Sequence, residues 1–516
     1  MAEPAAVLLH ELLLSAAERG GSDLAVSSDG SGLTYAELVD AAARLASALT
    51  DAGVRPGDRV AIAMANDRTV VVAVFATLFA GGAFVLINPE ATRDTLDAVL
   101  ARSGAKVLIE DATRSTAVGD VRRRIPTVRA VIAEGSGGAE GTIDLATAIA
   151  EATPITAARR MTSSDLAALV FTSGTSGEPK GVMMTHENLV FLAGSISGYL
   201  GIAPSDRILS ALSLAHTYGL SWLLASVRTG ASLFLERSFA YPAKLQQRIS
   251  DDAVTVFPGV PTVFAILLSL HTRTPLSLPS VTKVTCAGGA LLPSFHDGMR
   301  QVFPNADIFH MYGQTECMRA SYLEPGLLSQ RPTSCGKAIP GTEAMVLSSD
   351  GTPVAPGEIG TLHVRGPHVT PGYFREPELT AGIIRDGPDT NDRSLCTHDL
   401  FTVDDEGFLY FVGRSDEIIK SRGEKVTPVE IENALHAIDG VREAAVVGVP
   451  DDLLGEAVRA YVVLEEWVTL TEADIIRACR GALESYKVPK EVIVLEEMPK
   501  TPTGKIMKRR LVPQRP

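Results

Sequence analysis

A run of small and hydroxyl residues followed by a lysine occupies part of residues 171–189, FTSGTSGEPKGVMMTHENL. It comes directly after the apolar segment LAALV, so the sequence predicts a strand that ends in a glycine-rich loop. Such a loop buries little and loses much backbone entropy when it becomes ordered. Its backbone N–H groups can form an anion site, to which the hydroxyls and Lys180 add donors and a positive charge. We interpret the loop as a phosphate cradle, although a flexible surface turn would have the same composition.

The sequence MYGQTE at residues 311–316 places an aromatic ring, a glycine, a hydroxyl and a carboxylate within six residues. Tyr312 could stack on a nucleotide base, Thr315 could contact a phosphate, and Glu316 could bind Mg²⁺, which prefers oxygen ligands. Taken alone, the same six residues are also compatible with an ordinary turn.

Two later segments carry further groups suited to a nucleotide. Residues 398–432, HDLF to VEIE, contain Asp399 and Arg414, a carboxylate and a guanidinium that could hold ribose hydroxyls. The segment PKTPTGKIMKRRL offers Lys505 on a loop of Pro, Thr and Gly residues. By itself this basic segment could equally be a solvated tail.

Several familiar signatures are missing from the sequence. It contains no G-x-x-x-x-G-K-[ST], and GKIMK lacks the required hydroxyl. It also contains no G-x-G-x-x-G, H-E-x-x-H or G-x-S-x-G. The usual P-loop, dinucleotide, metalloprotease and hydrolase assignments are therefore not supported.

In order and spacing, these motifs resemble the adenylate-forming superfamily of acyl-CoA synthetases, stand-alone adenylation enzymes and luciferases. The resemblance runs over nearly the whole chain, from LTYAEL through NPEAT to GKIMKR. It implies a ligase that uses ATP and Mg²⁺ to convert a small carboxylic acid to acyl-AMP with release of pyrophosphate. It also implies an α/β fold, with parallel-sheet subdomains and a β-barrel-like part in a large N-terminal domain, followed by a small mobile α+β domain.

The resemblance also implies roles for individual residues. Those expected to hold ATP are Thr172, Ser173, Gly174, Thr175, Ser176, Gly177 and Lys180 for the triphosphate, Gly288, Gly289, Ala290, Tyr312 and Gly313 for the adenine, Thr315 for the α-phosphate, Glu316 for Mg²⁺, and Asp399 and Arg414 for the ribose.

Lys505 matches the lysine that bridges the substrate carboxylate and the α-phosphate during adenylation. Asp416 matches the hinge about which the small domain rotates after that step. Rotation would remove Lys505 and bring the loop around Gly423 to the site, where a residue without a side chain leaves room for a thiol. One site could then carry out two half-reactions.

The chain departs from the family pattern beside the ribose site. The family usually reads Thr-Gly-Asp where this chain has THD, so His398 replaces a glycine next to Asp399. The preceding IIRDGPDTNDRSLC also lacks the usual Gly-Trp. Both departures concern the geometry of this loop.

The acyl pocket would be lined partly by SLAHTYGLSWLL, with His216, Thr217 and Tyr218, and by Gly313. Enzymes of the family that activate α-amino acids typically place an aspartate where this chain has Thr217. An ammonium group buried without a partner is costly, so we expect an acid other than an α-amino acid. His216 could contact the acyl group or serve only in packing.

The acceptor of the acyl group is open at this point. A thiol, first of all CoA, is our expectation, and a carrier-protein phosphopantetheine or an amine are the alternatives. A non-catalytic sensor of adenylates on the same fold is a further alternative, which Lys180, Glu316 and Lys505 argue against. The oligomeric state is open too.

Length and composition indicate a multidomain globular protein. The chain has 516 residues, with 46% hydrophobic and 21% charged residues, too many residues for one compact core. A formal net charge of −14 argues against nucleic acid or an anionic membrane as partner. The change of character near Arg414 predicts a large domain over 1–413 and a small one over 414–516.

The five cysteines are far apart and form no C-x-x-C, which favours reduced thiols and a cytoplasmic location. The uncharged segment 69–87 has nearly the length of a membrane span. Because Gly81 and Gly82 divide it, we expect a buried helix followed by a core strand instead.

The remaining elements alternate between helix and strand. Residues 33–53 predict an amphipathic helix with a Thr34–Glu37 capping box and a stop at Gly53. Strands are expected in DRVAIAM, AKVLIE, DLAALVFTS and AVTVFPGV, a pattern typical of parallel sheets covered by helices. In the small domain, the sequence predicts one helix, two strands and a second helix, in that order.

Overall fold

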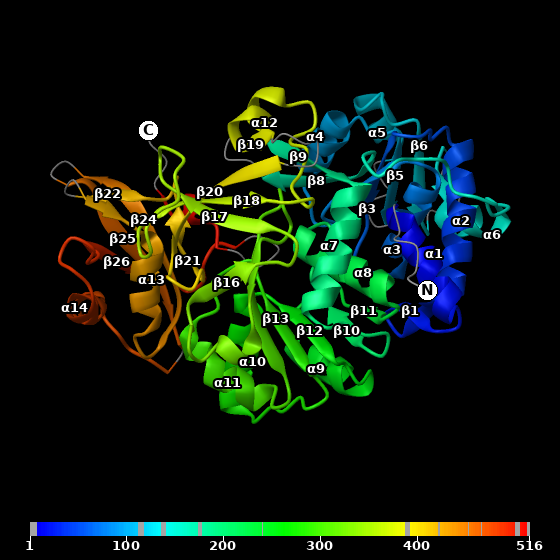
Figure 1. Ribbon diagram of the computed structural model, residues 1–516. Coiled ribbons are helices and arrows are strands. Elements are labelled where there is room, and N and C mark those ends of the chain that lie inside the picture. The colour runs from blue at the N-terminus through cyan, green and yellow to red at the C-terminus, as the bar shows by residue number, and fades with distance from the viewer. Residues whose placement is uncertain are drawn as a thin grey trace.

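The computed structural model describes residues 8–111, 118–135, 141–173, 178–239, 241–386, 393–421, 424–451, 454–465, 467–500 and 506–512 (Figure 1). Its strands form three sheets, of seven, fourteen and five strands. The first two belong to the large N-terminal part and the third to the last hundred residues.

The seven-stranded sheet has the order β7-β6-β5-β3-β4-β8-β9. All neighbours are parallel except β8 and β9, which form an antiparallel hairpin. The bounds are β3 (Arg59–Ala63), β4 (Ala83–Leu86), β5 (Val107–Asp111), β6 (Ala130–Glu134), β7 (Ile143–Asp144), β8 (Leu166–Ser173) and β9 (Pro179–Thr185).

The fourteen-stranded sheet has a parallel half and an antiparallel half. Its order is β17-β18-β20-β21-β16-β15-β14-β13-β12-β10-β11-β1-β2, and β19 pairs with β20. The run from β14 to β1 is parallel, and the run from β14 to β17 is antiparallel. The part expected to be barrel-like is this antiparallel half. The bounds are β1 (Leu24–Ser28), β2 (Ser31–Thr34), β10 (Arg207–Ser210), β11 (Ser232–Leu235), β12 (Val256–Gly259), β13 (Lys283–Cys286), β14 (Asp307–Tyr312), β15 (Ser321–Leu323), β16 (Ser334–Ala338), β17 (Glu343–Leu347), β18 (Gly360–Arg365), β19 (Ile384–Asp386), β20 (Arg393–Val403) and β21 (Leu409–Arg414).

Helices cover both sheets of the large part. Their bounds are α1 (Leu9–Gly20), α2 (Tyr35–Asp51), α3 (Arg68–Phe79), α4 (Arg93–Ser103), α5 (Val118–Arg124), α6 (Leu145–Glu151), α7 (His186–Tyr199), α8 (Thr217–Thr229), α9 (Pro242–Asp251), α10 (Pro261–Arg273), α11 (His296–Val302) and α12 (Pro377–Ile383).

Helices α7 and α8 lie between the two sheets (Figure 1). Residues 219–227 of α8 are all buried, as expected for an interior helix that is largely apolar on every face. One core cluster contains Trp222 of α8, Phe84 of the seven-stranded sheet and Leu233 of the fourteen-stranded sheet. This shared core fixes the two sheets relative to each other.

Two local predictions are confirmed. Helix α2 has the Thr34–Glu37 capping box and buries Leu38, Ala42, Leu45 and Leu49. The segment 69–87 contains α3, buried from Val70 to Phe79, followed by β4. Among the described residues, no helix is long and apolar enough to cross a membrane.

The last hundred residues form a small α+β unit, coloured orange to red in Figure 1. Its sheet has the order β23-β22-β25-β24, and β26 pairs with β25. The predicted helices and long strands are present, whereas β22, β23 and β26 were not predicted. The bounds are β22 (Ile419–Ser421), β23 (Glu424–Val426), α13 (Pro428–His436), β24 (Val441–Asp451), β25 (Gly455–Leu464), α14 (Glu472–Ala482) and β26 (Glu491–Val494). The domain boundary at Arg414 stays a prediction.

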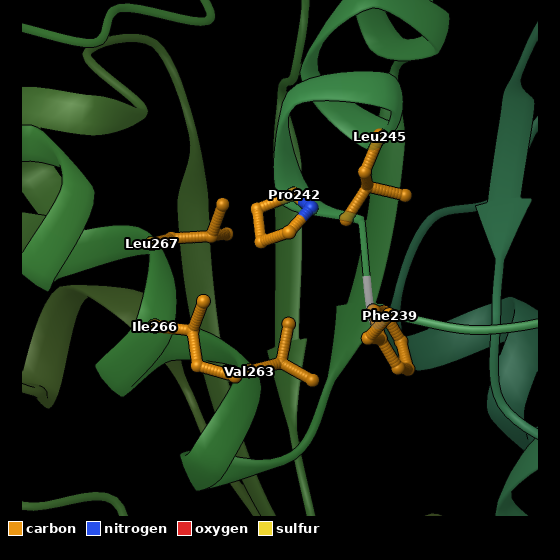
Figure 2. A pocket seen from close by; sticks show the side chains of 6 residues that line it. All are labelled: Phe239, Pro242, Leu245, Val263, Ile266 and Leu267. Carbon is orange, nitrogen blue, oxygen red and sulfur yellow. The ribbon is translucent and has the colours of Figure 1, made fainter.

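Figure 2 shows a small hollow between α9 and α10 that is lined by apolar side chains. Leu245 of α9 and Val263, Ile266 and Leu267 of α10 point toward one another across it, beside Phe239. The hollow admits no water-sized molecule and offers no polar side chain. It is a packing gap.

Candidate active site

Two of the predicted nucleotide segments follow neighbouring parallel strands. Residues 288–290 come just after β13, and residues 313–316 come just after β14, its hydrogen-bonded neighbour. The carboxyl ends of parallel strands meet at one edge of a sheet, where ligands of α/β proteins bind. Gly288 has φ +82°, a conformation that favours glycine, and the next residue, Gly289, lies close to Pro261.

A buried histidine supports this edge. Nε2 of His310 accepts a hydrogen bond from the Leu291 backbone N–H at 3.4 Å, and Nδ1 lies 2.9 Å from the Ser334 carbonyl. Burial lowers the pKa of His310 to about 4, so the ring is neutral at pH 7. Sequence reasoning did not single out this residue.

Tyr312 and Asp399, separated by 87 residues in sequence, are joined directly. The Tyr312 phenol donates a hydrogen bond of 2.6 Å to Oδ2 of Asp399. Gln314 donates from Nε2 to the same oxygen and to the Thr397 carbonyl, both at 2.8 Å. Burial and then the Asp399 charge raise the pKa of Tyr312, which keeps the phenol protonated as a donor. Gln314 is a contact that the sequence analysis missed.

Arg414 connects the predicted ribose site with the predicted hinge. It stands opposite Asp399 in the β20–β21 pair, and its Nε lies 4.0 Å from Oδ1 of Asp399. The same Nε donates a hydrogen bond of 3.1 Å to Oδ1 of Asp416. The three residues therefore form one charged cluster at the carboxyl end of β21.

His398 adopts the conformation that explains the glycine of the family pattern. Its φ is +57°, in the left-handed region, and its side chain is exposed. A residue with a Cβ is strained there by about 1–2 kcal/mol, whereas glycine is not. The departure seen in the sequence thus keeps the backbone turn and adds strain to it.

The predicted phosphate loop lies in sequence between β8 and β9, which pair as an antiparallel hairpin. Thr172 stands opposite Lys180, and Ser173 stands opposite Pro179. The Lys180 Nζ lies 5.6 Å from the centre of the Tyr373 ring. The glycines and hydroxyl residues that follow Ser173 in sequence, Gly174, Thr175, Ser176 and Gly177, lie outside the described residues.

Tyr373 also holds Glu316. Its phenol donates a hydrogen bond of 2.7 Å to Oε1 of Glu316, and the Thr370 backbone N–H donates to the Glu316 carbonyl at 2.9 Å. Burial and then the Glu316 charge raise the pKa of Tyr373. No local pattern distinguishes Tyr373 from any loop aromatic, so sequence reasoning missed it.

The predicted acyl-pocket residues cluster at the start of α8. His216 precedes the helix, and burial lowers its pKa, which favours the neutral ring. Tyr218 donates a hydrogen bond to Thr285, at 2.8 Å to the hydroxyl or 3.0 Å to the carbonyl. A Cβ on Gly313 would lie 2.5 Å from the Met318 carbonyl oxygen, so only glycine fits there. Thr217 is the first residue of the helix.

Two further predicted residues, Gly423 and Lys505, lie outside the described residues. Their roles stay predictions.

Comparison with known proteins places this geometry in a family. The model of the AMP-binding enzyme family matches residues 13–374, and that of the AMP-binding enzyme C-terminal domain matches residues 430–505. A 3-[(3aS,4S,7aS)-7a-methyl-1,5-dioxo-octahydro-1H-inden-4-yl]propanoyl:CoA ligase of Rhodococcus jostii is 33% identical and covers 96% of both chains. A feruloyl-CoA synthase of an Amycolatopsis species is 33% identical over 94% of both chains.

Solved structures agree with this assignment. The anthranilate CoA ligase AuaEII in complex with anthranoyl-AMP superposes with a TM-score of 0.91 at 26% identity, over 98% of this chain and 97% of that one. ATP-bound MatB from Rhodopseudomonas palustris gives a TM-score of 0.88 at 29% identity, over 97% of this chain and 98% of that one. The chain therefore belongs to the AMP-binding enzymes of the adenylate-forming superfamily and is an AMP-forming acid–thiol ligase.

Proposed function

We propose that this enzyme converts a carboxylic acid other than an α-amino acid to acyl-AMP and then transfers the acyl group to CoA. The proposal rests on one observation: at the carboxyl edge of the parallel strands, Tyr312 and Gln314 both donate hydrogen bonds to the Asp399 carboxylate. It brings a candidate base-stacking ring and a candidate ribose-binding carboxylate into one hydrogen-bonded unit.

The charges of the site suit the first half-reaction. A carboxylate must approach a polyanion, so positive charge is needed at the phosphates. Lys180 is held at the base of the hairpin, opposite Thr172, where it can serve the β- and γ-phosphates. Lys505 is proposed to bridge the substrate carboxylate and the α-phosphate, and Thr315 to contact that phosphate.

The Glu316 carboxylate is suited to be a magnesium ligand. One of its oxygens accepts the Tyr373 hydrogen bond, while Oε2 makes no hydrogen bond within the described part of the chain. Mg²⁺ is commonly bound by one or two carboxylates together with substrate phosphates, so a single oriented carboxylate suffices. When bound, the ion would neutralise charge on the phosphates.

The choice of acid class rests on Thr217 and on the relatives. A threonine cannot pair with a buried ammonium group as an aspartate would. The relatives named above are ligases for feruloyl and bicyclic propanoyl groups, and one neighbour was solved with anthranoyl-AMP. None of these acyl groups is that of an α-amino acid.

CoA is proposed as the acceptor because the relatives along the full chain are CoA ligases. A carrier-protein phosphopantetheine would present the same thiol, and an amine would attack the same acyl-AMP. The proposed entry route for the thiol is the loop around Gly423.

The test is a panel of acids with ATP and Mg²⁺, assayed first for pyrophosphate release. The best acid is then incubated with CoA, with a phosphopantetheinylated carrier protein, and with free amino acids, and the product masses are compared. We expect acyl-CoA. Pyrophosphate release without thioester would favour the amide alternative, and its absence with every acid would reject the function.

A further inference from the structure

Among the described residues, Arg319 is an arginine that is buried without an anionic partner. Arg319, three residues after Glu316, is 1% exposed. Within the described part of the chain, its Nε and Nη2 atoms have no hydrogen-bond partner, and no ion pair there includes it. A guanidinium stays protonated in proteins, so this is a buried positive charge.

Arg319 borders the acyl-pocket residues on two sides. Its guanidinium carbon lies 5.1 Å from the centre of the Tyr218 ring. Its Cα lies 2.8 Å from where a Cβ on Gly313 would stand, so the backbones of these two residues abut. The arginine thus lies between two residues proposed to line the pocket.

A tight backbone turn sets the position of Arg319. Met318 has φ +53°, unusual for a residue other than glycine, and the Arg319 N–H donates to the Cys317 carbonyl across it at 2.5 Å. Such three-residue turns are rare and strained, and strain of this kind clusters at ligand sites. The chain therefore holds the arginine in place at an energetic cost.

The groups around the guanidinium are neutral at pH 7. Burial raises the pKa of Tyr218, and it raises the pKa of Tyr199 too, where the Arg319 charge and a hydrogen bond with the Arg319 side chain oppose the shift. Burial also raises the pKa of Cys317 to about 12, and it lowers to about 4 the pKa of His368, which lies against the Arg319 backbone. None of them supplies a negative charge.

The Tyr218 ring alone does not compensate the charge. A cation–π contact is worth about 0.5–2 kcal/mol, whereas burying an ion without a partner costs several kcal/mol. The ring also leaves the in-plane donors Nε and Nη2 unused, and these are the donors that match a carboxylate in a bidentate pair.

We propose that Arg319 binds a second anionic group on the acyl substrate, so that the enzyme activates a dicarboxylic acid and adenylates the carboxylate remote from this arginine. This inference rests on the proposed function, because it assigns the substrate class of the same site. An arginine here would also repel an ammonium group, in keeping with the exclusion of α-amino acids.

The test compares matched pairs of acids by ATP–pyrophosphate exchange. Each pair consists of a dicarboxylic acid, linear or aromatic, and its monoamide, which has nearly the same shape but a neutral far end. With the wild-type enzyme the best diacid should exceed its monoamide in kcat/KM by about 10- to 100-fold, the range for a hydrogen bond to a charged group.

Arg319→Met should remove this preference by lowering the diacid value and leaving the monoamide value nearly unchanged. Arg319→Lys, which keeps the charge and guards against a folding defect in the first variant, should retain part of it. Arg207→Met is the matched control, since Arg207 also lies over an aromatic ring, 4.6 Å from the centre of Phe234, but outside the site. It should leave the preference intact.

The outcomes separate the two proposals. If the kcat/KM for exchange is at least as high with the monoamides as with the diacids, the assignment of Arg319 is wrong, and the ligase function still stands. An undiminished diacid preference in Arg319→Met would overturn the assignment as well. No exchange with any acid would reject the function itself.

Discussion

The phenol of Tyr373 donates a hydrogen bond of 2.7 Å to the carboxylate of Glu316, and Lys180 lies 5.6 Å from the centre of the same ring. One aromatic residue therefore connects the hairpin of the predicted phosphate loop with the proposed magnesium ligand. A neutral phenol donates without adding charge, so it orients the carboxylate and leaves its negative charge for a cation.

Replacing Tyr373 by phenylalanine should weaken adenylation. The loss of one hydrogen bond to a charged group is worth about 1.5–3 kcal/mol, so we expect ATP–pyrophosphate exchange to fall by roughly tenfold or more, with a higher Mg²⁺ concentration at half-maximal rate. The measurement is a Mg²⁺ titration of the exchange rate. Tyr410→Phe is the control, because the Tyr410 phenol donates to Asp404 at 3.0 Å elsewhere in the large part. An unchanged Mg²⁺ dependence would show that the contact is only structural.

His398→Gly should stabilise the protein. At φ +57° histidine pays a conformational penalty that glycine avoids, and the greater freedom of glycine in the unfolded chain offsets part of the gain. We expect the free energy of unfolding to rise by about 0.5–1 kcal/mol, measured by urea denaturation. His398→Ala keeps the strain and should give no gain. A glycine variant less stable than the alanine variant would contradict the argument.

Local patterns carried the predictions that the structure confirms. Helix α2 follows from a capping box and a helical apolar period, and α3 with β4 follows from a glycine pair inside an apolar run. Strands β22, β23 and β26 were missed because they are short, with charged residues among them. Strands β22 and β26 pair with β25, and β23 pairs with β22, and no local pattern reveals these pairings.

The contacts that build the site are long-range and could not be read from the sequence. The partners Tyr312 and Asp399 were both named, but their hydrogen bond depends on how β14 and β20 meet. Gln314 and Tyr373 carried no signal of their own. Arg319 did have a sequence signal, because it is the one charged residue in the stretch CMRASYL. An arginine is almost never fully buried without a partner, so a charge in such a stretch is informative once its burial is known.

The acid class can be tested without any variant. Because Thr217 cannot pair with an ammonium group, aryl, aliphatic or cyclic carboxylic acids should exchange pyrophosphate at least about tenfold faster than α-amino acids. The comparison uses each amino acid alongside its deaminated analogue, so that only the ammonium group differs. An α-amino acid as the best substrate would overturn the assignment of this position.

Lys505→Ala should separate the two half-reactions. We expect acyl-AMP formation to be lost, by roughly 100-fold or more if the lysine stabilises charge in the transition state. Attack of CoA on supplied acyl-AMP should persist, because the lysine would have rotated away. Lys500→Ala is the control on the same segment, since Lys500 is paired with Glu443 at 2.8 Å. Equal loss of both steps would refute domain rotation about Asp416.

The acceptor step can be isolated at Gly423. If its loop flanks the thiol channel after rotation, a leucine there should block thioester formation while pyrophosphate release in the first turnover continues, so that acyl-AMP accumulates. Single-turnover product analysis with CoA measures both steps. Gly481→Leu in α14, where an added Cβ meets nothing within 4 Å, controls for a large side chain on the same domain. An unchanged melting temperature of Gly423→Leu excludes a folding defect. Thioester formation at the wild-type rate would place the thiol channel elsewhere and strengthen the case for an amine that reaches the adenylate by another route.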